Sequence, residues 1–414
     1  MAWCLYDWAY GAFTVVVSTF VFATYFVRAV AADPATGTAQ WAAAQTGAGL
    51  LVAVLAAPLG AIADLSGRKR SLLALFTAIM SLATIALWFV RPVVSDVSLA
   101  LSLVAVATVA YELATVFYNA MLPDVASPAR LGRVSGLGWS LGYGGGLSCL
   151  LICLVFLIGR HPPPFGLDPA SAEPVRAAAV LAGVWIALFG WPVLVFVPDR
   201  GERRPWGQSL RNGLADLRRV MREAAADPAL LRFLLARMIY TDGLTTLFVF
   251  GGIYAAGQFG MDARGTLLLG ILLNVSAGVG AVGFAMIEDR IGAKPTVLIA
   301  LTSLILFGAA MLATHDETVF WALAGGLGLF IGPAQSASRS LMARMAPAAD
   351  RNVHFGLFAL SGRVTGFVGP GALGIVTALT NSQRAGMSVI LVLLVSGALL
   401  LLAVPVRPAP VTTR

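Results

Sequence analysis

Three acidic residues lie inside long apolar runs, where an ionised side chain is costly. They are Glu112, Asp242 and Asp7, and the first two stand well inside their runs. A charged residue at the centre of a bilayer costs at least about 2.5–3.5 kcal/mol on insertion scales, so each is a functional candidate. Such a carboxylate could bind a proton or the ammonium group of a substrate. The structural alternatives are an ion pair for Glu112 and a cap on the first helical turn for Asp7.

Three arginines in similar surroundings offer the complementary charge. Arg237 and Arg363 lie inside apolar runs, whereas Arg339 lies near the end of one. We expect these guanidinium groups to neutralise the acidic residues or to hold a substrate carboxylate, with Arg363 as the preferred clamp. Arg339 could instead extend its head group to water at the membrane surface.

Polar uncharged side chains accompany these charges. Thr108, Glu112, Thr115 and Asn119 are spaced by four, three and four residues, so they share one face of a helix. Such a stripe should face a bundle interior or a water-filled cavity. Asn274, in another run, could bond to a substrate, although a bond to a neighbouring helix is the preferred interpretation.

A short charged stretch, GAIADLSGRKR at 60–70, separates two apolar runs. Glycine permits a tight turn, and an acidic residue at a helix end can accept from an arginine and from a neighbouring helix N-terminus. We interpret the stretch as a latch between two halves; anchoring of the loop to anionic lipid is the alternative. Its residues are Gly60, Asp64, Gly67, Arg68, Lys69 and Arg70, with a partial second copy in EDRIGAK at Asp289, Arg290, Gly292 and Lys294.

The composition of the 414-residue chain assigns it to a membrane. It is 58% hydrophobic and 12% charged, with a mean hydropathy of +0.85, whereas soluble domains carry about 25% charged residues. The net charge of +8 is spread over short loops, which argues against nucleic-acid binding. We see no phosphate loop, metal-ligand spacing or nucleophile motif, so we expect no catalytic residue, metal or cofactor and no enzymatic activity.

Runs of about 20 apolar residues are typical of transmembrane helices. The sequence predicts an all-α membrane protein with twelve such helices in two pseudo-symmetric six-helix bundles. The expected helices lie near 3–31, 41–63, 71–91, 97–121, 134–158, 175–197, 230–256, 265–287, 295–314, 318–342, 353–379 and 385–405.

Arginine and lysine are distributed unequally between the two sets of loops. One set, together with the C-terminal tail, holds 18 of these residues and the other holds six. The positive-inside rule therefore predicts that both termini are cytoplasmic. The expected domains are a first bundle at 1–197, a cytoplasmic linker at 198–229, a second bundle at 230–406 and a cytoplasmic tail at 407–414.

The two halves match each other at a nearly fixed offset. The acidic residue, glycine and lysine of the charged stretch recur 225 residues later in EDRIGAK. A run of three glycines recurs at an offset of 224. We infer that the halves are homologous bundles with the same topology. The glycines of the run are Gly138, Gly142 and Gly145, matched by Gly362, Gly366 and Gly369.

Parallel six-helix repeats with this charged turn resemble the major facilitator superfamily. LYDWAYGAFT at 5–14, LPDVA at 122–126, IYTDG at 239–243 and GPAQSASRS at 332–340 resemble its vacuole-effluxer-like branch, which includes fungal vacuolar amino-acid exporters and bacterial relatives. Tyr10 and Gly11 stand where that branch usually has Asn-Ser. The usual polar lead is missing, so a start upstream of Met1 is left open.

The resemblance implies a secondary transporter that exports or exchanges amino acids or similar small polar solutes by alternating access, with the proton as coupling ion. We expect Glu112 and Asp242 to carry the coupling, with Arg237 and Arg363 as charge partners. The expected partners are the lipid bilayer and a small-molecule substrate, without nucleic acid. We expect a monomer in a plasma membrane, namely a bacterial inner membrane. The alternatives are an exporter of lipophilic compounds and a transporter-like sensor that binds without transport.

Overall fold

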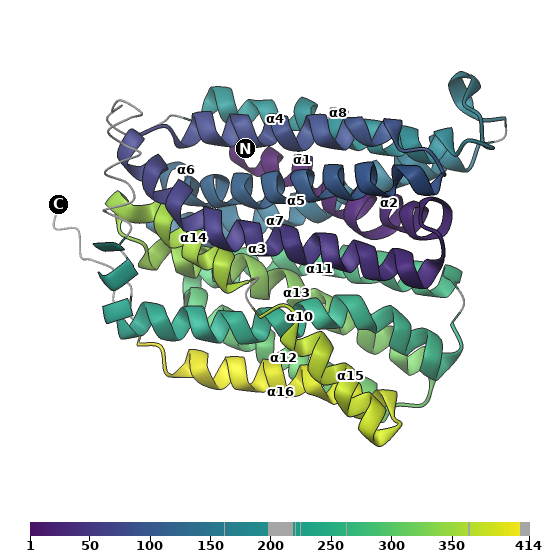
Figure 1. The fold of residues 1–414 in the computed structure, drawn as a ribbon. Coiled ribbons are helices and arrows are strands. Elements are labelled where there is room, and N and C mark those ends of the chain that lie inside the picture. Colours follow the sequence, from purple (N-terminus) through teal and green to yellow (C-terminus); the bar gives the residue numbers. More distant parts are fainter. Residues whose placement is uncertain are drawn as a thin grey trace.

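The computed structural model is built from helices joined by short connections (Figure 1). It describes residues 1–160, 162–197, 218–219, 221–223, 225–261, 263–362 and 365–405, and within these ranges there is no strand. The predicted linker at 198–229 lies largely outside the described residues, and the tail at 407–414 lies wholly outside them.

Eleven helical segments in the described part of the chain are long and apolar enough to cross a membrane, and each matches a predicted segment. The first is α1 (Ala2–Ala12), which continues through wider π-helical turns and the short α2 (Phe22–Tyr25) to Val30. The other spanning helices are α3 (Pro34–Ser66), α4 (Lys69–Ala86), α5 (Val97–Ala120), α7 (Leu131–Ile152), α8 (Glu173–Phe196), α10 (Pro228–Phe259), α11 (Ala263–Ile291), α12 (Ala293–Ala313), α13 (Glu317–Met345) and α16 (Gln383–Leu402).

The twelfth segment, predicted as one helix near 353–379, is instead two shorter helices. These are α14 (Arg351–Ser361) and α15 (Val368–Thr380). Pro370 has no N–H and its ring clashes with the carbonyl four residues earlier, so a helix cannot run regularly through this position. Proline is tolerated in a first turn, where α15 places it. The break lies between the end of α14 at Ser361 and the start of α15 at Val368, the stretch that holds Gly362 and Gly366 of the repeated glycine run.

The helices form two bundles, as the internal repeat predicts. Figure 1 shows the first-half helices, purple to blue, gathered above most of the second-half helices, teal to yellow. The halves meet where α3 packs against α14 and where α7 packs against α11 and α13. The expected boundaries of the two bundles, at residues 1–197 and 230–406, stay a prediction.

The connections after α3, α5, α11 and α13 lie at one end of the bundle. Lys294, which follows the α11–α12 turn, donates from Nζ to the carbonyl oxygens of Leu402 (2.9 Å) and Val404 (2.5 Å). The C-terminus of α16 therefore lies at the same end of the bundle. We call this end the termini end and the opposite one the far end.

Glycines allow the backbones of α1 and α7 to touch. A Cβ atom on Gly145 would lie 2.2 Å from the carbonyl oxygen of Trp8, and one on Gly11 would lie 2.1 Å from that of Gly142. No side chain fits at these distances. The glycine run in α7 is therefore a helix-packing surface, in keeping with the small residues that membrane helices place at close crossings.

The outer surface of the molecule is apolar. Large side chains such as Leu82, Val54 and Leu379 are 65%, 68% and 82% exposed. Contiguous apolar surface on this scale is unfavourable in water, but lipid tails cover it readily. The protein is an integral membrane protein.

Candidate functional site

A cavity of about 800 Å³ lies between the two bundles. Helices α1, α5 and α7 of the first half and α10, α11 and α13 of the second contribute to its wall. Its lining includes the aromatic side chains of Tyr10, Tyr111 and Trp139 and the guanidinium groups of Arg237 and Arg339. Among the residues that the structure describes, no Asp or Glu lines it. The described lining therefore combines aromatic rings and aliphatic side chains with two basic groups.

The cavity extends toward the far end of the bundle. Its lining residues on α10 run from Arg237 to Ala256, a rise of about 28 Å at 1.5 Å per residue. Ala256 lies near the far end of α10, and Thr266, also in the lining, lies near the far end of α11. The floor of the cavity, at Arg339, faces the termini end.

Arg237 projects from α10 into this cavity. Its Nη1 donates to the carbonyl oxygen of Phe358 (2.5 Å) and to Oγ of Ser361 (2.8 Å), and its guanidinium carbon lies 3.5 Å from the centre of the Phe358 ring. Among the described residues, no carboxylate lies within ion-pair distance of Arg237. An arginine has five N–H donors, so three of them have no partner in the described part of the chain.

Arg339 is in the opposite situation, because every donor of its guanidinium is used. Nη1 and Nη2 lie 3.1 and 3.2 Å from Oδ2 of Asp7, Nη1 also contacts Oδ1 of Asn119 (3.4 Å), and Nε and Nη2 donate to Oγ (2.9 Å) and O (2.6 Å) of Ser135. Arg339 is 2% exposed. The expectation that it extends to water at the membrane surface is wrong.

Asp7 is fully buried beside Arg339. Oη of Tyr10 donates to Oδ1 of Asp7, and Oη of Tyr118 donates to Oδ2 at 2.7 Å. Asp7 lies inside α1 and bonds across to α13, so the alternative of a first-turn cap is wrong. The Asp7–Arg339 pair therefore links the two halves at the floor of the cavity. Removing one partner alone would leave a buried charge uncompensated, at a cost of about 3–5 kcal/mol.

Asp242 is buried against the broken helix. Its Oδ2 accepts from the N–H of Gly369 (2.8 Å) in the first turn of α15, and its Oδ1 has no hydrogen-bond partner within the described ranges. Asp242 is 3% exposed. The two buried acids thus meet different partners: an arginine from the opposite half for Asp7 and a helix N-terminus in the same half for Asp242.

The remaining predicted residues are placed as follows. Asn119 and Asn274 line the cavity, but Nδ2 of Asn274 donates to the carbonyl oxygen of Gly270 (2.8 Å) in its own helix rather than to a neighbouring one. Glu112 is half-buried and is not among the lining residues. Arg363, the preferred carboxylate clamp, lies outside the described residues.

At the termini end, Asp64 joins α3 to the start of α14. Its Oδ1 accepts from the backbone N–H (3.1 Å) and Nδ2 (2.6 Å) of Asn352, and its Oδ2 accepts from the N–H of Val353 (3.0 Å). The positive end of a helix dipole stabilises such a carboxylate. A Cβ atom on Gly60 would lie 2.6 Å from the carbonyl oxygen of Asn352, so this contact requires glycine.

The second copy makes the pseudo-symmetric contact between the other pair of helices. Oδ1 of Asp289, near the end of α11, accepts from the N–H groups of Gly132 (3.0 Å) and Arg133 (3.3 Å) at the start of α7. The turns that follow the two aspartates contain Gly67 and Gly292, with φ of +61° and +93°. Only glycine adopts these conformations without strain.

The basic residues of the two copies differ in what they contact. Lys69 is buried and pairs with Asp124, which also pairs with Arg351 of the opposite half (3.0 Å). Burial in an ion pair does not fit lipid anchoring for Lys69. Lys294 instead binds the end of α16 within its own half, and Arg290 is exposed. Arg68 and Arg70 are half-buried.

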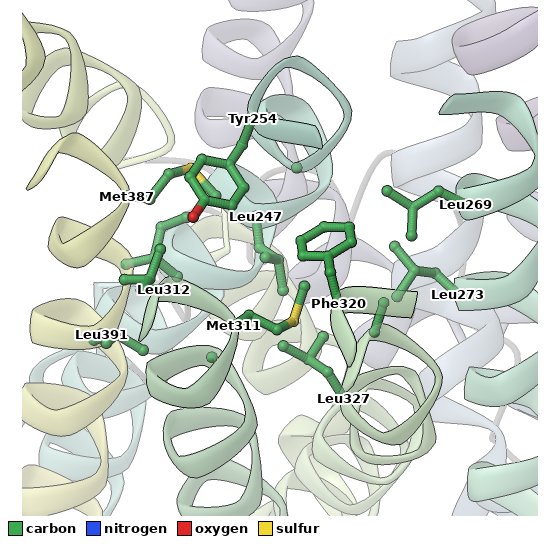
Figure 2. A pocket seen from close by; sticks show the side chains of 14 residues that line it. Leu247, Tyr254, Leu269, Leu273, Met311, Leu312, Phe320, Leu327, Met387 and Leu391 are labelled. Atoms are coloured by element: carbon green, nitrogen blue, oxygen red, sulfur yellow. The ribbon is translucent and has the colours of Figure 1, made fainter. Parts of the chain in front are cut away.

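A second cavity of about 50 Å³ lies inside the C-terminal bundle (Figure 2). Figure 2 shows apolar side chains of α10, α11, α12, α13 and α16 around it, with Tyr254 as the labelled side chain that carries an oxygen. That hydroxyl has no hydrogen-bond partner in the described part of the chain. Residues Leu247, Leu269 and Leu273 line both cavities, so the small apolar chamber adjoins the large one.

Sequence reasoning missed Asp124 and Arg351, which pair across the halves, and the buried Glu288. Asp124 stands in the quoted LPDVA segment, and Glu288 precedes Asp289 in EDRIGAK. Oγ of Ser340 donates to Glu288 within the second half, and Glu288 is 1% exposed. Acidic residues inside the quoted segments are a signal that could have identified both acids. In the described ranges, no group of three His, Cys, Asp or Glu side chains is placed to hold a metal ion.

Comparisons with known proteins relate the chain to a transporter family. A family model described as vacuole effluxer Atg22 like matches residues 48–412. An uncharacterized MFS-type transporter, YxiO of Bacillus subtilis (strain 168), is 26% identical over 409 residues, which cover 98% of this chain and 94% of the relative. Autophagy-related protein 22 of Cryptococcus neoformans var. neoformans serotype D is 27% identical over 284 residues, covering 64% of this chain and 48% of the fungal protein.

Solved structures share the fold at low sequence identity. The proton:xylose symporter XylE bound to 6-bromo-6-deoxy-D-glucose has a TM-score of 0.74 at 13% identity, covering 98% of this chain and 94% of that one. A bacterial homologue of the iron transporter ferroportin in the outward-facing state has a TM-score of 0.68 at 13% identity, covering 97% and 96%. The chain is a transporter of the major facilitator superfamily and belongs to the vacuole effluxer Atg22-like family.

Proposed function

We propose that the protein moves a small polar solute that carries a carboxylate, an amino acid or a similar compound, by alternating access. The observation that carries this proposal is Arg237, which lines the central cavity with three N–H donors unpartnered among the described residues. Two parallel N–H···O bonds from one guanidinium suit a carboxylate. Since no Asp or Glu among the described residues lines the cavity, its described wall favours a negatively charged group.

The contacts at the termini end support alternating access. Asp64, Asp289 and the Asp124–Arg351 pair hold the halves together there, while the cavity extends to the far end. Rocking the halves apart at the termini end would expose the floor of the cavity on that side. The proposal places both termini in the cytoplasm of a plasma membrane, so that the cavity faces the outside.

The transport cycle is export or exchange coupled to protons, carried out by a monomer. The sequence assigns the coupling to Glu112 and Asp242. Asp242 supports this assignment, since its buried Oδ1 has no partner in the described part of the chain and an ionised carboxylate is costly there. The coupling role of Glu112 stays a prediction, which rests on the position of this residue in the sequence.

The alternative is an exporter of lipophilic compounds. It is favoured by the apolar chamber of Figure 2, which shares Leu247, Leu269 and Leu273 with the central cavity. A lipophilic substrate would extend an apolar group into that chamber and would not depend on the charge of Arg237. A sensor that binds without transport would bind the ligand but would not exchange it across a membrane.

Counterflow in proteoliposomes tests the proposal. Vesicles loaded with a mixture of unlabelled amino acids should take up radiolabelled amino acids transiently, and Arg237→Gln should abolish this uptake. Arg237→Lys is the matched control, because it keeps the charge but loses the planar fork and should retain part of the activity. Uptake that is unchanged in Arg237→Gln, or exchange of lipophilic dyes alone, would contradict the proposal.

A further inference from the structure

We propose that the rings of Tyr10, Tyr111 and Trp139, which we call the ring cage, hold the positive end of the substrate. The cage selects N-methylated amino acids and betaines over amino acids with a free ammonium group. The inference rests on the proposed function, in which Arg237 binds the carboxylate of the substrate, and it names the class of solute that fits the opposite wall of the same cavity.

The three candidate acids, Asp7, Asp242 and Glu112, do not line the central cavity. Asp7 is fully buried in its ion pair with Arg339, and Asp242 bonds to the start of α15. Within the described ranges, no carboxylate therefore lines the cavity where it could pair with an ammonium group. The positive end of a zwitterion bound at Arg237 must be held by other groups.

Aromatic rings lie on the wall that the first half contributes. Tyr10 of α1, Tyr111 of α5 and Trp139 of α7 line the cavity. The ring centres of Tyr10 and Tyr111 are 5.3 Å apart and the ring planes are inclined at 66°, so these two rings form a corner rather than a flat stack. The face of an aromatic ring carries partial negative charge, which attracts a cation.

The hydroxyl of Tyr10 donates to the carboxylate of Asp7. Such a bond increases the electron density of the phenol ring, because the oxygen takes on more negative charge. Asp7 and Arg339 neutralise each other beneath this ring. The ring of Tyr10 therefore attracts a cation although no carboxylate of the described residues is open to the cavity.

The ring cage and Arg237 lie at one level of the bundle. Each of the four residues is eight or nine positions from the termini end of its helix, which is α1, α5, α7 or α10. This corresponds to about 12–14 Å at 1.5 Å per residue. Arg237 comes from the second half and the rings come from the first, so a zwitterion held between them contacts both halves.

Methylation of the nitrogen decides whether aromatic rings suffice to hold it. A primary ammonium group has three N–H donors, and moving them from water to ring faces leaves their hydrogen bonds unmade, which is costly. A trimethylammonium group has no N–H donor and keeps its positive charge. Quaternary ammonium groups are accordingly the ligands that aromatic cages recognise.

Ligands that share the carboxylate and differ only at the nitrogen test the inference. The probes are glycine and γ-aminobutyrate, each compared with its N-trimethyl form, so that two separations of the charges are covered. Their binding to the purified protein is measured by titration calorimetry. In at least one series the trimethyl form should bind at least about tenfold more tightly, as a cation–π contact shielded from water allows. No preference for the trimethyl form in either series overturns the inference.

Uncharged analogues distinguish a cation site from an apolar one. In the corresponding tert-butyl acids, such as tert-butylacetate for N-trimethylglycine, carbon replaces the charged nitrogen while the shape and the carboxylate stay the same. The tert-butyl acid should bind at least about tenfold more weakly than the preferred trimethyl compound. Equal binding of the two overturns the inference, because the rings would then select an apolar group.

Variants of Tyr111 test the rings themselves. Tyr111→Leu removes the aromatic face and should lower the preference for the trimethyl form, whereas Tyr111→Phe keeps the face and should keep the preference. The preference is a ratio of two affinities measured in one variant, so partial loss of folded protein does not change it. An equally strong preference in the two variants overturns the inference.

Arg237→Gln separates this inference from the proposed function. The variant should weaken both members of a series, since both carry the carboxylate. Binding that depends on Arg237 but shows no preference for methylated nitrogen leaves the proposed function standing and overturns the ring cage alone. A preference that survives with undiminished affinity in Arg237→Gln contradicts the proposed function and leaves the ring cage. Failure of every probe to bind overturns the ring cage, while the counterflow experiment still decides the proposed function.

Discussion

The contact of Asp64 with the start of α14 leads to a prediction that the structure makes quantitative. The Asp64 carboxylate accepts three hydrogen bonds, at 3.1, 2.6 and 3.0 Å, from Asn352 and Val353. Asp64→Asn keeps the shape of the side chain but replaces one oxygen by an NH₂ group, which cannot accept. At least one bond is lost, and the charge that faces the helix N-terminus is lost with it.

The size of the effect follows from these two losses. A hydrogen bond to a charged group contributes about 1.5–3 kcal/mol, and a charge at a helix N-terminus about 0.3–1 kcal/mol. We therefore expect the closed termini end to be destabilised by about 2–4 kcal/mol, which raises the open-to-closed ratio by about 30- to 700-fold.

Spin labels on cysteines introduced at Ala129 and Ala349 measure this ratio at a fixed pH by pulsed electron resonance. These alanines are exposed on opposite halves at the termini end. Asp316→Asn is the matched control, because Oδ1 of Asp316 also accepts from a helix N-terminus, at Val319 N (3.0 Å), but at the far end and within one half. The long distance should become populated in Asp64→Asn and not in Asp316→Asn. Equal distance distributions in the two variants would refute the reasoning that Asp64 holds the halves together.

Two further predictions concern packing and the second ion pair. Gly145→Ala should lower the melting temperature in detergent, since its Cβ would lie 2.2 Å from the Trp8 carbonyl oxygen and overpacking costs about 1–3 kcal/mol. Gly49→Ala, where nothing lies within 4 Å, is the control; an equal fall in both would contradict the close crossing. Arg351→Met should raise the open-to-closed ratio by about fivefold through loss of about 1 kcal/mol. Lys294→Met, whose contacts stay within one half, should leave the ratio unchanged, and an equal rise would refute the assignment.

Helix positions and the repeat could be predicted because they depend on local sequence. Apolar runs located the spans to within a few residues, and the 225-residue offset related Asp64 to Asp289 before either partner was known. Glycine was also informative at Gly67 and Gly292, where positive φ requires it. The break before Pro370 was missed because the glycines around it also fit a continuous packing helix.

Partner choice across the halves could not be predicted, because it depends on three-dimensional packing. Arg339 lies 332 residues from Asp7 along the chain, and nothing in the local sequence favours this pair over Asp242 or Glu112. The position of Arg339 near a helix end suggested exposure, whereas the opposite bundle covers it. Conversely, Arg237 was identified as a candidate, but only the cavity distinguishes its open donors from the fully used donors of Arg339.

The central claim is that Arg237 binds a substrate carboxylate in the cavity between the halves, and ligand-induced thermal stabilisation tests it most directly. The purified protein would be heated with each of the twenty amino acids and with the corresponding amines that lack the carboxylate. A ligand at 100 times its Kd stabilises the folded state by about 2.7 kcal/mol. The account predicts a rise in melting temperature with at least one amino acid, none with its amine, and loss of the rise in Arg237→Gln. Equal stabilisation by the amine, or an undiminished rise in Arg237→Gln, would contradict it.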